Sequence, residues 1–133
     1  MRGDSYSLRL TAAALLLLFA LSACGGGMSE AEQAAAEMTG GGDPVRGRAA
    51  IERYGCGTCH TIPGIRGADA LVGPPLTQVA SRAYVGGVLT NSPENMIRWI
   101  RDPRAVDSLT AMPTLGVSDQ EARDIVSYLY TLK

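Results

Sequence analysis

The chain has 133 residues, which is enough for at most one ordinary domain once its ends are set aside. It carries 12 Lys and Arg against 13 Asp and Glu, a formal net charge of −1 at pH 7. This balance excludes the strongly basic surface on which nucleic-acid binding depends, so we expect no nucleic-acid partner.

Residues 1–23 have the layout of a secretory signal. Arg2 and Arg9 flank a charged leader, residues 10–21 form an apolar run, and small residues precede Cys24. The apolar run is about a dozen residues long, whereas a membrane-spanning helix needs roughly 20. The stretch L-S-A-C resembles a bacterial lipoprotein cleavage site. We therefore expect export to the periplasmic face of a bacterial membrane and a lipid on Cys24; an ordinary signal peptide is the alternative.

Residues 24–42 are predicted to be a flexible tether. Glycine triplets bracket a short Ala/Glu stretch that has no large apolar face. A flexible coil of this length would span on the order of 20–25 Å. Once residues 1–23 are removed, with Arg2, Arg9 and Asp4, the chain keeps 10 basic and 12 acidic side chains, a formal net charge of −2.

The folded domain is predicted over residues 43–133, and its first helix begins at Asp43-Pro44. A carboxylate cap followed by proline at the first helical position is a typical helix start, and we expect the helix to end near Tyr54. Gly47 inside it costs about 1 kcal/mol relative to alanine, which indicates that another backbone or ring packs close by.

Loops and short helices make up the rest of the domain. Residues 61–75 are rich in Gly and Pro and are predicted to be a loop, followed by a short helix over 76–83. Ser92-Pro93 opens a further helix, residues 102–117 form a second loop, and a capping box at 118–121 starts the last helix, to about residue 132. No alternating run predicts a strand, so the expected fold class is all-α.

The predicted domain is poor in large core residues. Its aromatic side chains are Trp99, Tyr54, Tyr84, Tyr128 and Tyr130. A domain of about 90 residues with short helices and long loops would be marginally stable alone. We therefore expect a bound group to fill its centre.

The sequence C-G-T-C-H, residues 56–60, holds two of the three cysteines and the only histidine. A structural zinc site needs four ligands, and no second cluster completes the set. A thioredoxin-like redox pair would need a strand before the motif, where a helix is predicted. The remaining interpretation is covalent haem attachment through Cys56 and Cys59, with His60 as an axial ligand of the iron. A structural disulfide would leave the poor core unexplained.

A single histidine leaves the sixth position of the iron to another kind of group. Met96 falls at helical spacing with Ile100 and is interpreted as a core residue. Met112 lies in a loop before Pro113 and is predicted to be the second axial ligand; the alternative is a loop methionine that packs against the porphyrin. The other candidates, near the chain end or in the predicted tether, are Lys133, Met28 and Met38.

These motifs together resemble a class I cytochrome c over nearly all of residues 43–133. The matching pieces are D-P-V-R-G-R-A-A-I-E-R-Y-G-C-G-T-C-H, G-P-P-L, M-P-T-L-G-V-S and E-A-R-D-I-V-S-Y-L-Y. The run S-P-E-N-M-I-R-W-I-R-D-P-R-A-V followed by M-P is similar to the cytochrome c domain of haem-copper oxidase subunit II. The resemblance implies an electron carrier rather than an enzyme, with one covalently bound haem c.

The resemblance also implies roles for individual residues. Gly47 is expected to pack against Tyr128 where the first and last helices cross. The carbonyl of Pro74 is expected to accept the Nδ1 proton of His60, which fixes the tautomer of this ligand. The side chains expected near the haem propionates are Trp99, Arg82 and Tyr84; a core tryptophan and a solvated arginine are the alternatives.

The main functional hypothesis is a membrane-tethered cytochrome c that transfers single electrons in a respiratory chain. The expected acceptor is a terminal oxidase and the expected donor a quinol-oxidising complex. A cytochrome subunit of a periplasmic dehydrogenase is an alternative, and a gas-binding haem sensor with an open sixth position is another. Docking through sparse arginines and docking through apolar contact both remain open.

Overall fold

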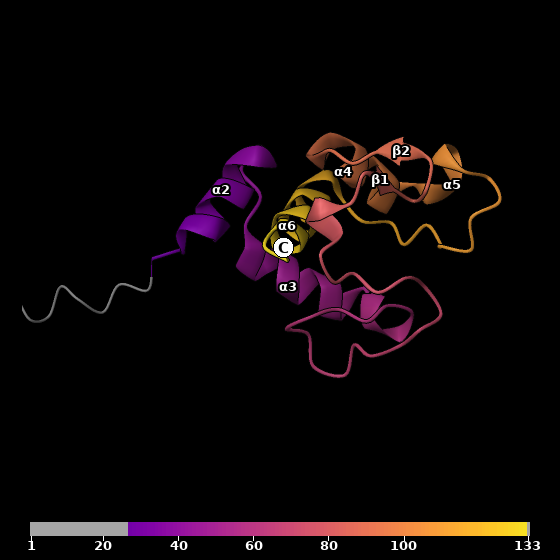
Figure 1. Ribbon diagram of the computed structural model, residues 1–133, viewed down its shortest axis with the longest axis horizontal. Helices are drawn as coiled ribbons and strands as arrows, with labels where there is room; N and C mark the ends of the chain where they lie inside the picture. Colours follow the sequence, from indigo (N-terminus) through magenta and orange to yellow (C-terminus); the bar gives the residue numbers. More distant parts are fainter. Residues whose placement is uncertain (1–26, 133) are drawn as a thin grey trace, which may run out of the picture.

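The computed structural model describes residues 27–132, so the predicted signal and the lipidation site Cys24 lie outside the described residues. The helices are α2 (Glu30–Met38), α3 (Pro44–Arg53), α4 (Pro93–Arg101), α5 (Pro103–Val106) and α6 (Asp119–Tyr130). Short 3-10 turns span Cys56–Thr58 and Val79–Ser81, and strands β1 (Tyr84–Val85) and β2 (Leu89–Thr90) form a hairpin (Figure 1). The predicted helical fold class is confirmed. Among the described helices, none has the length and apolar character needed to cross a membrane.

Helices α3 and α6 cross at the centre of the domain, and both begin where the sequence predicts. The side chain of Asp43 accepts hydrogen bonds from the backbone N–H groups of Val45 and Arg46. The capping box of α6 joins Ser118 and Glu121. Gly55, with φ of 68°, adopts the left-handed conformation just after the last turn of α3 and so ends that helix.

Gly47 allows the two helices to approach closely, because a Cβ atom at this position would overlap the backbone carbonyl of Asp124. The Asp124 carboxylate is 3% exposed and accepts hydrogen bonds from the Asp43 N–H at 2.8 Å and from Arg46 Nε at 2.9 Å. The atoms nearest to a Cβ at Gly47 belong to Asp124 and Ile125, and the contact of Gly47 with Tyr128 that the resemblance implies stays a prediction. The Tyr128 hydroxyl donates to the carbonyl of Pro63 at 2.7 Å. Gly47 thus packs on the backbone of Asp124 in α6. The Tyr128 hydroxyl holds the loop that follows α3.

Several short elements differ from the sequence prediction. The hairpin β1–β2 was not predicted, because strands of two residues are too short to show alternation. The helix predicted over 76–83 is only the 3-10 turn Val79–Ser81, which follows Gln78 in the left-handed conformation at φ 54°. Helix α5 lies within the loop predicted for 102–117.

The largest correction concerns the predicted flexible tether, because its residues 30–38 form α2, which packs on α6. Ala35 is 0% exposed and Thr39 is 1% exposed. Arg123 Nη1 donates to the Thr39 carbonyl at 3.1 Å. A face of small residues can lie directly against a neighbouring helix, so α2 packs without the large apolar side chains that the prediction looked for.

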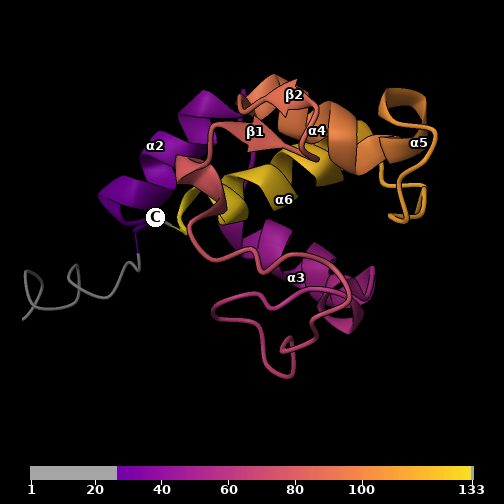
Figure 2. The same cartoon turned by 45° about the vertical axis from the view of Figure 1, so that its right-hand side comes forward.

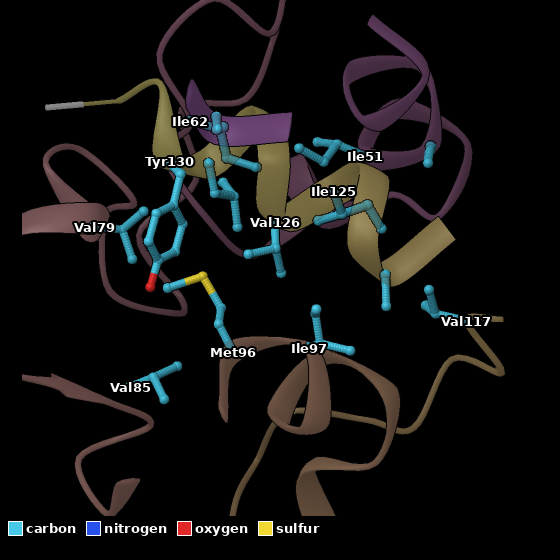
Figure 3. Close-up of a cluster of buried hydrophobic side chains, with 14 of the residues drawn as sticks. Ile51, Ile62, Val79, Val85, Met96, Ile97, Val117, Ile125, Val126 and Tyr130 are labelled. Atoms are coloured by element: carbon cyan, nitrogen blue, oxygen red, sulfur yellow. The ribbon is translucent and has the colours of Figure 1, made fainter. Parts of the chain in front are cut away.

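The core lies between α3, α4 and α6. Figure 3 shows Ile51, Ile125 and Val126 with Met96 and Tyr130 in this cluster. Met96 is 1% exposed, which confirms its interpretation as a core residue. The long segment between α3 and β1 loops away from the helices (Figure 2), and this side of the core is hollow.

Candidate functional site

A cavity of about 420 Å³ lies between the core helices and the two long loops. Its volume is in the range typical of small-molecule and cofactor sites. Its walls are largely apolar, and the aliphatic side chains around it include Ile51, Ile62, Leu76, Val79, Ile125 and Leu129. All the side chains that the sequence analysis assigned to the haem or its iron line this same cavity, or, for Pro74, lie in its wall.

Cys56, Cys59 and His60 are brought together by a single turn after α3. The Cys56 carbonyl accepts hydrogen bonds from the N–H groups of Cys59 at 3.2 Å and His60 at 3.0 Å. Both cysteines are free thiols, so they do not form the disulfide considered as an alternative. Burial raises the pKa of the Cys56 thiol, which keeps it protonated at neutral pH.

The imidazole of His60 is held in one orientation. Its Nδ1 lies 2.7 Å from the carbonyl of Pro74, and because a carbonyl can only accept, Nδ1 must carry the proton. A Cβ atom at Gly73 would overlap the ring, so the ring packs directly on this glycine. The Gly73 N–H in turn donates to the Cys59 carbonyl at 2.7 Å. This arrangement leaves Nε2 as the nitrogen able to bind a metal.

Met112 approaches the cavity from the loop between α5 and α6. It is half-buried and lines the cavity together with Pro113. Its N–H donates to the Thr110 hydroxyl at 3.2 Å, which shapes the loop before it. Met96 also lines the cavity, but it comes from α4 and is part of the core. Of these two thioethers, Met112 is therefore on the segment that can adjust to a ligand.

The three residues predicted to lie near the propionates also line the cavity. The guanidinium of Arg82 donates to the carbonyl of Pro75 and, at 3.0 Å, to that of Thr77, so it is held at the wall. Trp99 packs against Gly86, where a Cβ atom would overlap its ring. Tyr84 is 60% exposed and lies at the edge of the cavity.

Sequence reasoning missed other residues that shape this site. Gly73 and Gly86 allow ring systems to pack against the backbone, and Val85 brings the hairpin to the cavity wall. The glycine pair 86–87 is a turn signal that could have revealed the hairpin. The aliphatic wall carries no local signal, because its members come from distant segments.

The donor set fits a covalently attached haem. Two free thiols, one imidazole with an available Nε2 and the thioethers of Met96 and Met112 line a single apolar cavity. Over residues 27–132, no group of three or more His, Cys, Asp or Glu side chains could hold a metal ion by itself. The two thiols and the oriented imidazole suit haem, a macrocycle that brings its own iron.

Comparisons with known proteins agree with this chemistry. The sequence model of the cytochrome c family matches residues 44–133. The chain is 33% identical over 89 residues to cytochrome c oxidase subunit 2 of Alkalihalophilus pseudofirmus, which covers 66% of this chain and 25% of that protein. It is 32% identical over 96 residues to the subunit of the same name from Bacillus sp. (strain PS3). This match covers 68% of this chain and 27% of that protein. The chain thus spans about a quarter of the length of these relatives. No solved structure matches it significantly.

Proposed function

The chain belongs to the cytochrome c family, whose members bind haem covalently and transfer electrons, and from this premise we propose that it is a membrane-tethered monohaem carrier in a respiratory chain. The observation that carries the proposal is the gathering of Cys56, Cys59, His60 and Met112 around one apolar cavity. The motif C-x-x-C-H occurs once in the sequence, which supports one haem per chain.

We assign the attachment of the haem to Cys56 and Cys59, and the two axial positions to His60 and Met112. When bound, haem supplies an iron that takes up and releases one electron. The Pro74 carbonyl orients the imidazole of His60 and increases its basicity. Met112 would supply a thioether to the iron, and a thioether ligand favours the reduced state. The largely apolar wall would surround the haem with apolar side chains, which suits electron transfer.

A terminal oxidase is the proposed electron acceptor and a quinol-oxidising complex the proposed donor. The similarity to proteins named cytochrome c oxidase subunit 2 supports the oxidase. A cytochrome subunit of a periplasmic dehydrogenase remains the second candidate. A gas-binding sensor is less favoured, because Met112 lines the cavity and would offer the iron a second protein ligand.

Export and lipid attachment at Cys24 are part of the same proposal and rest on the sequence pattern around that cysteine. The experiment is membrane fractionation of the wild type and of Cys24→Ser. Retention of the wild type on membranes and release of the variant support the lipid anchor. Retention of both would point to an uncleaved signal or a tightly bound partner.

The electron-transfer role is tested with the reduced protein and membranes that contain the terminal oxidase. Oxygen-dependent reoxidation, followed by visible absorbance, supports an oxidase as acceptor. Reduction by a periplasmic dehydrogenase, without reoxidation by these membranes, would favour the second candidate. Ready binding of carbon monoxide to the reduced protein would favour the sensor.

A further inference from the structure

Helix α2 is an addition to the family domain, because the family match begins at residue 44, after α2 has ended. It nevertheless belongs to the packed structure. Ala35 is fully buried, Arg123 donates to the Thr39 carbonyl, and a Cβ atom at Gly42 would overlap the Arg123 carbonyl. The segment from α2 to α3 is therefore fixed on α6.

The face of α6 that receives this segment is not the face that lines the cavity. Gln120 and Arg123 contact the segment 39–42, whereas Ile125 and Leu129 line the cavity. At 100° per residue, Arg123 and Ile125 lie on nearly opposite sides of the helix. In Figures 1 and 2, α2 lies to the left of α6, and the loops around the cavity extend below and to the right. Helix α2 and the cavity are thus on different sides of the domain.

The surface of α2 is unsuited to burial in a membrane. Its exposed side chains are polar, acidic or small, apart from Met38; they include Glu30, Gln33, Ala34 and Glu37. Helices that lie in the membrane interface combine a large apolar face with a basic one. The exposed surface of α2 has neither a large apolar face nor a basic one. We therefore expect α2 to lie in water, near the lipid surface, and not within it.

The packing of α2 also shortens the connection to the proposed lipid. Only residues 25–28 separate Cys24 from the N-cap Ser29. Fully extended, this connection reaches at most about 18 Å, compared with about 68 Å if all of residues 25–42 were free. The anchor is therefore tied closely to the end of α2.

We propose that α2 is a fixed spacer that holds the domain on the membrane with its haem cavity directed away from the lipid surface. The inference rests on lipid attachment at Cys24, which is part of the proposed function. Its consequence concerns the partner: the electron acceptor must present its docking surface in the aqueous phase above the membrane. A partner site at the level of the lipid headgroups would be out of reach.

The test measures energy transfer from a lipid to the haem. Full-length, haem-loaded protein from a bacterial host that processes lipoproteins is mixed with zwitterionic vesicles. The vesicles contain a headgroup-labelled fluorescent lipid whose emission overlaps haem absorption. Ala35→Arg places a guanidinium in the buried contact with α6 and should free α2. Ala34→Arg adds the same charge at an exposed position of the same helix and is the matched control. A third protein carries a Gly-Ser insert of about twelve residues between Met28 and Ser29.

We expect weak quenching with the wild type and with Ala34→Arg. Quenching should be at least about twofold stronger with Ala35→Arg and with the insert, because a longer flexible connection allows the cavity to approach the lipid. The insert leaves α2 and the domain intact, so the test does not depend on how well the Ala35 variant folds. If the wild type and the insert variant both bind the vesicles and quench equally, the spacer role of α2 is wrong, while lipid attachment at Cys24 still stands. Haem-loaded wild type that stays in the supernatant would overturn lipid attachment, and the spacer with it.

Discussion

The crossing of α3 and α6 and the loops around the cavity are held in place in different ways. At the crossing, Gly47 meets the backbone of α6, and the Asp124 carboxylate accepts hydrogen bonds from Asp43, Arg46 and Gln120. Burial alone would raise the pKa of Asp124, but these hydrogen bonds outweigh it and lower the pKa. In the loops, Leu71, Val72 and Leu109 are 78%, 82% and 91% exposed.

This difference distinguishes a region that the polypeptide stabilises by itself, the crossing of α3 and α6, from a region whose stability depends on the cofactor, the loops around the cavity. The crossing combines close packing with a buried carboxylate, Asp124, whose hydrogen bonds come from neighbouring protein groups, so it needs no added partner. The loops carry the proposed iron ligands. Ile62, Ile65 and Val117 bury their side chains in the core, but Leu71, Val72 and Leu109 stay exposed. An empty cavity of about 420 Å³ would cost on the order of 10 kcal/mol at ~24 cal/mol per Å³, an upper limit for a site open to water. That is comparable to the whole stability of a typical domain.

The largest expected effect follows from removing both covalent links. In the double variant Cys56→Ala, Cys59→Ala, we expect loss of covalent haem and loss of most of the cooperative unfolding transition, because the cavity is then unfilled. Circular dichroism and mass spectrometry measure the two effects. The wild type carried through the same preparation is the control. A variant that unfolds as cooperatively as the wild type would mean that the core does not depend on haem.

Adding a methyl group to Gly47 tests the crossing of α3 and α6. Gly47→Ala should lower the free energy of unfolding by about 2 kcal/mol, since overpacking forces α3 and α6 apart. Denaturant titration measures it. Ala49→Gly, at an exposed position of α3, should cost only the helix-propensity difference of about 1 kcal/mol. A Gly47 variant more stable than the wild type would contradict the close approach of the two backbones.

The proposed iron ligand of the loop, Met112, can be removed without changing the crossing of α3 and α6. Met112→Ala should leave the haem covalently attached, lower its reduction potential on the order of 100 mV, and open the iron to carbon monoxide. Redox titration and the visible spectrum measure these changes. Met96→Leu, a volume-conserving change in the core, should leave the spectrum unaltered. An unchanged spectrum in the Met112 variant would assign the sixth position to another group.

The smallest expected effect is at Glu121, which joins the cap of α6 to the end of α3. Hydrogen bonds from Ser118 and from the Tyr54 hydroxyl lower the pKa of Glu121 to about 2, from an ordinary value of 4.5. Because the folded-state pKa is depressed, this stabilisation is present above about pH 4.5 and is lost as the pH falls toward 2. Glu121→Gln should therefore lower the Tm at pH 7, and the difference from the wild type should shrink over this interval.

The control for this pH dependence is Glu37→Gln, at an exposed position of α2. Its difference in Tm from the wild type should be small at each pH, because no ion pair of Glu37 is present in the described structure. A Glu121 variant whose Tm difference stays constant from pH 7 to about pH 2 would show that the carboxylate is not stabilised by its hydrogen bonds.

Local signals account for the parts of the fold and site that the sequence predicted. Asp43-Pro44 and the Ser118–Glu121 box are chemical marks of helix starts, and both helices begin there. The spacing within C-G-T-C-H brings Cys56 and His60 to one turn without help from distant segments. The interpretation of Met96 as core followed from helical spacing alone.

The features that were not predicted depend on contacts between distant segments. Helix α2 is stabilised on α6 through Ala35, and an alanine carries no sign of the helix it will meet. The sequence indicates that something packs close to Gly47, but that the backbone of Asp124 lies nearest depends on how the two helices cross. The hairpin at Gly86 is positioned by packing against Trp99, which lies beyond it in the sequence.

The central claim is that Cys56, Cys59, His60 and Met112 together hold one six-coordinate haem. The most direct measurement is the visible spectrum of the purified, haem-loaded protein, recorded oxidised, reduced, and reduced with carbon monoxide. The account predicts a c-type spectrum that is unaffected by carbon monoxide, with a weak far-red sulfur-to-iron band in the oxidised form. A c-type haem that binds carbon monoxide readily would contradict the assignment of Met112, and a protein without haem would contradict the whole account.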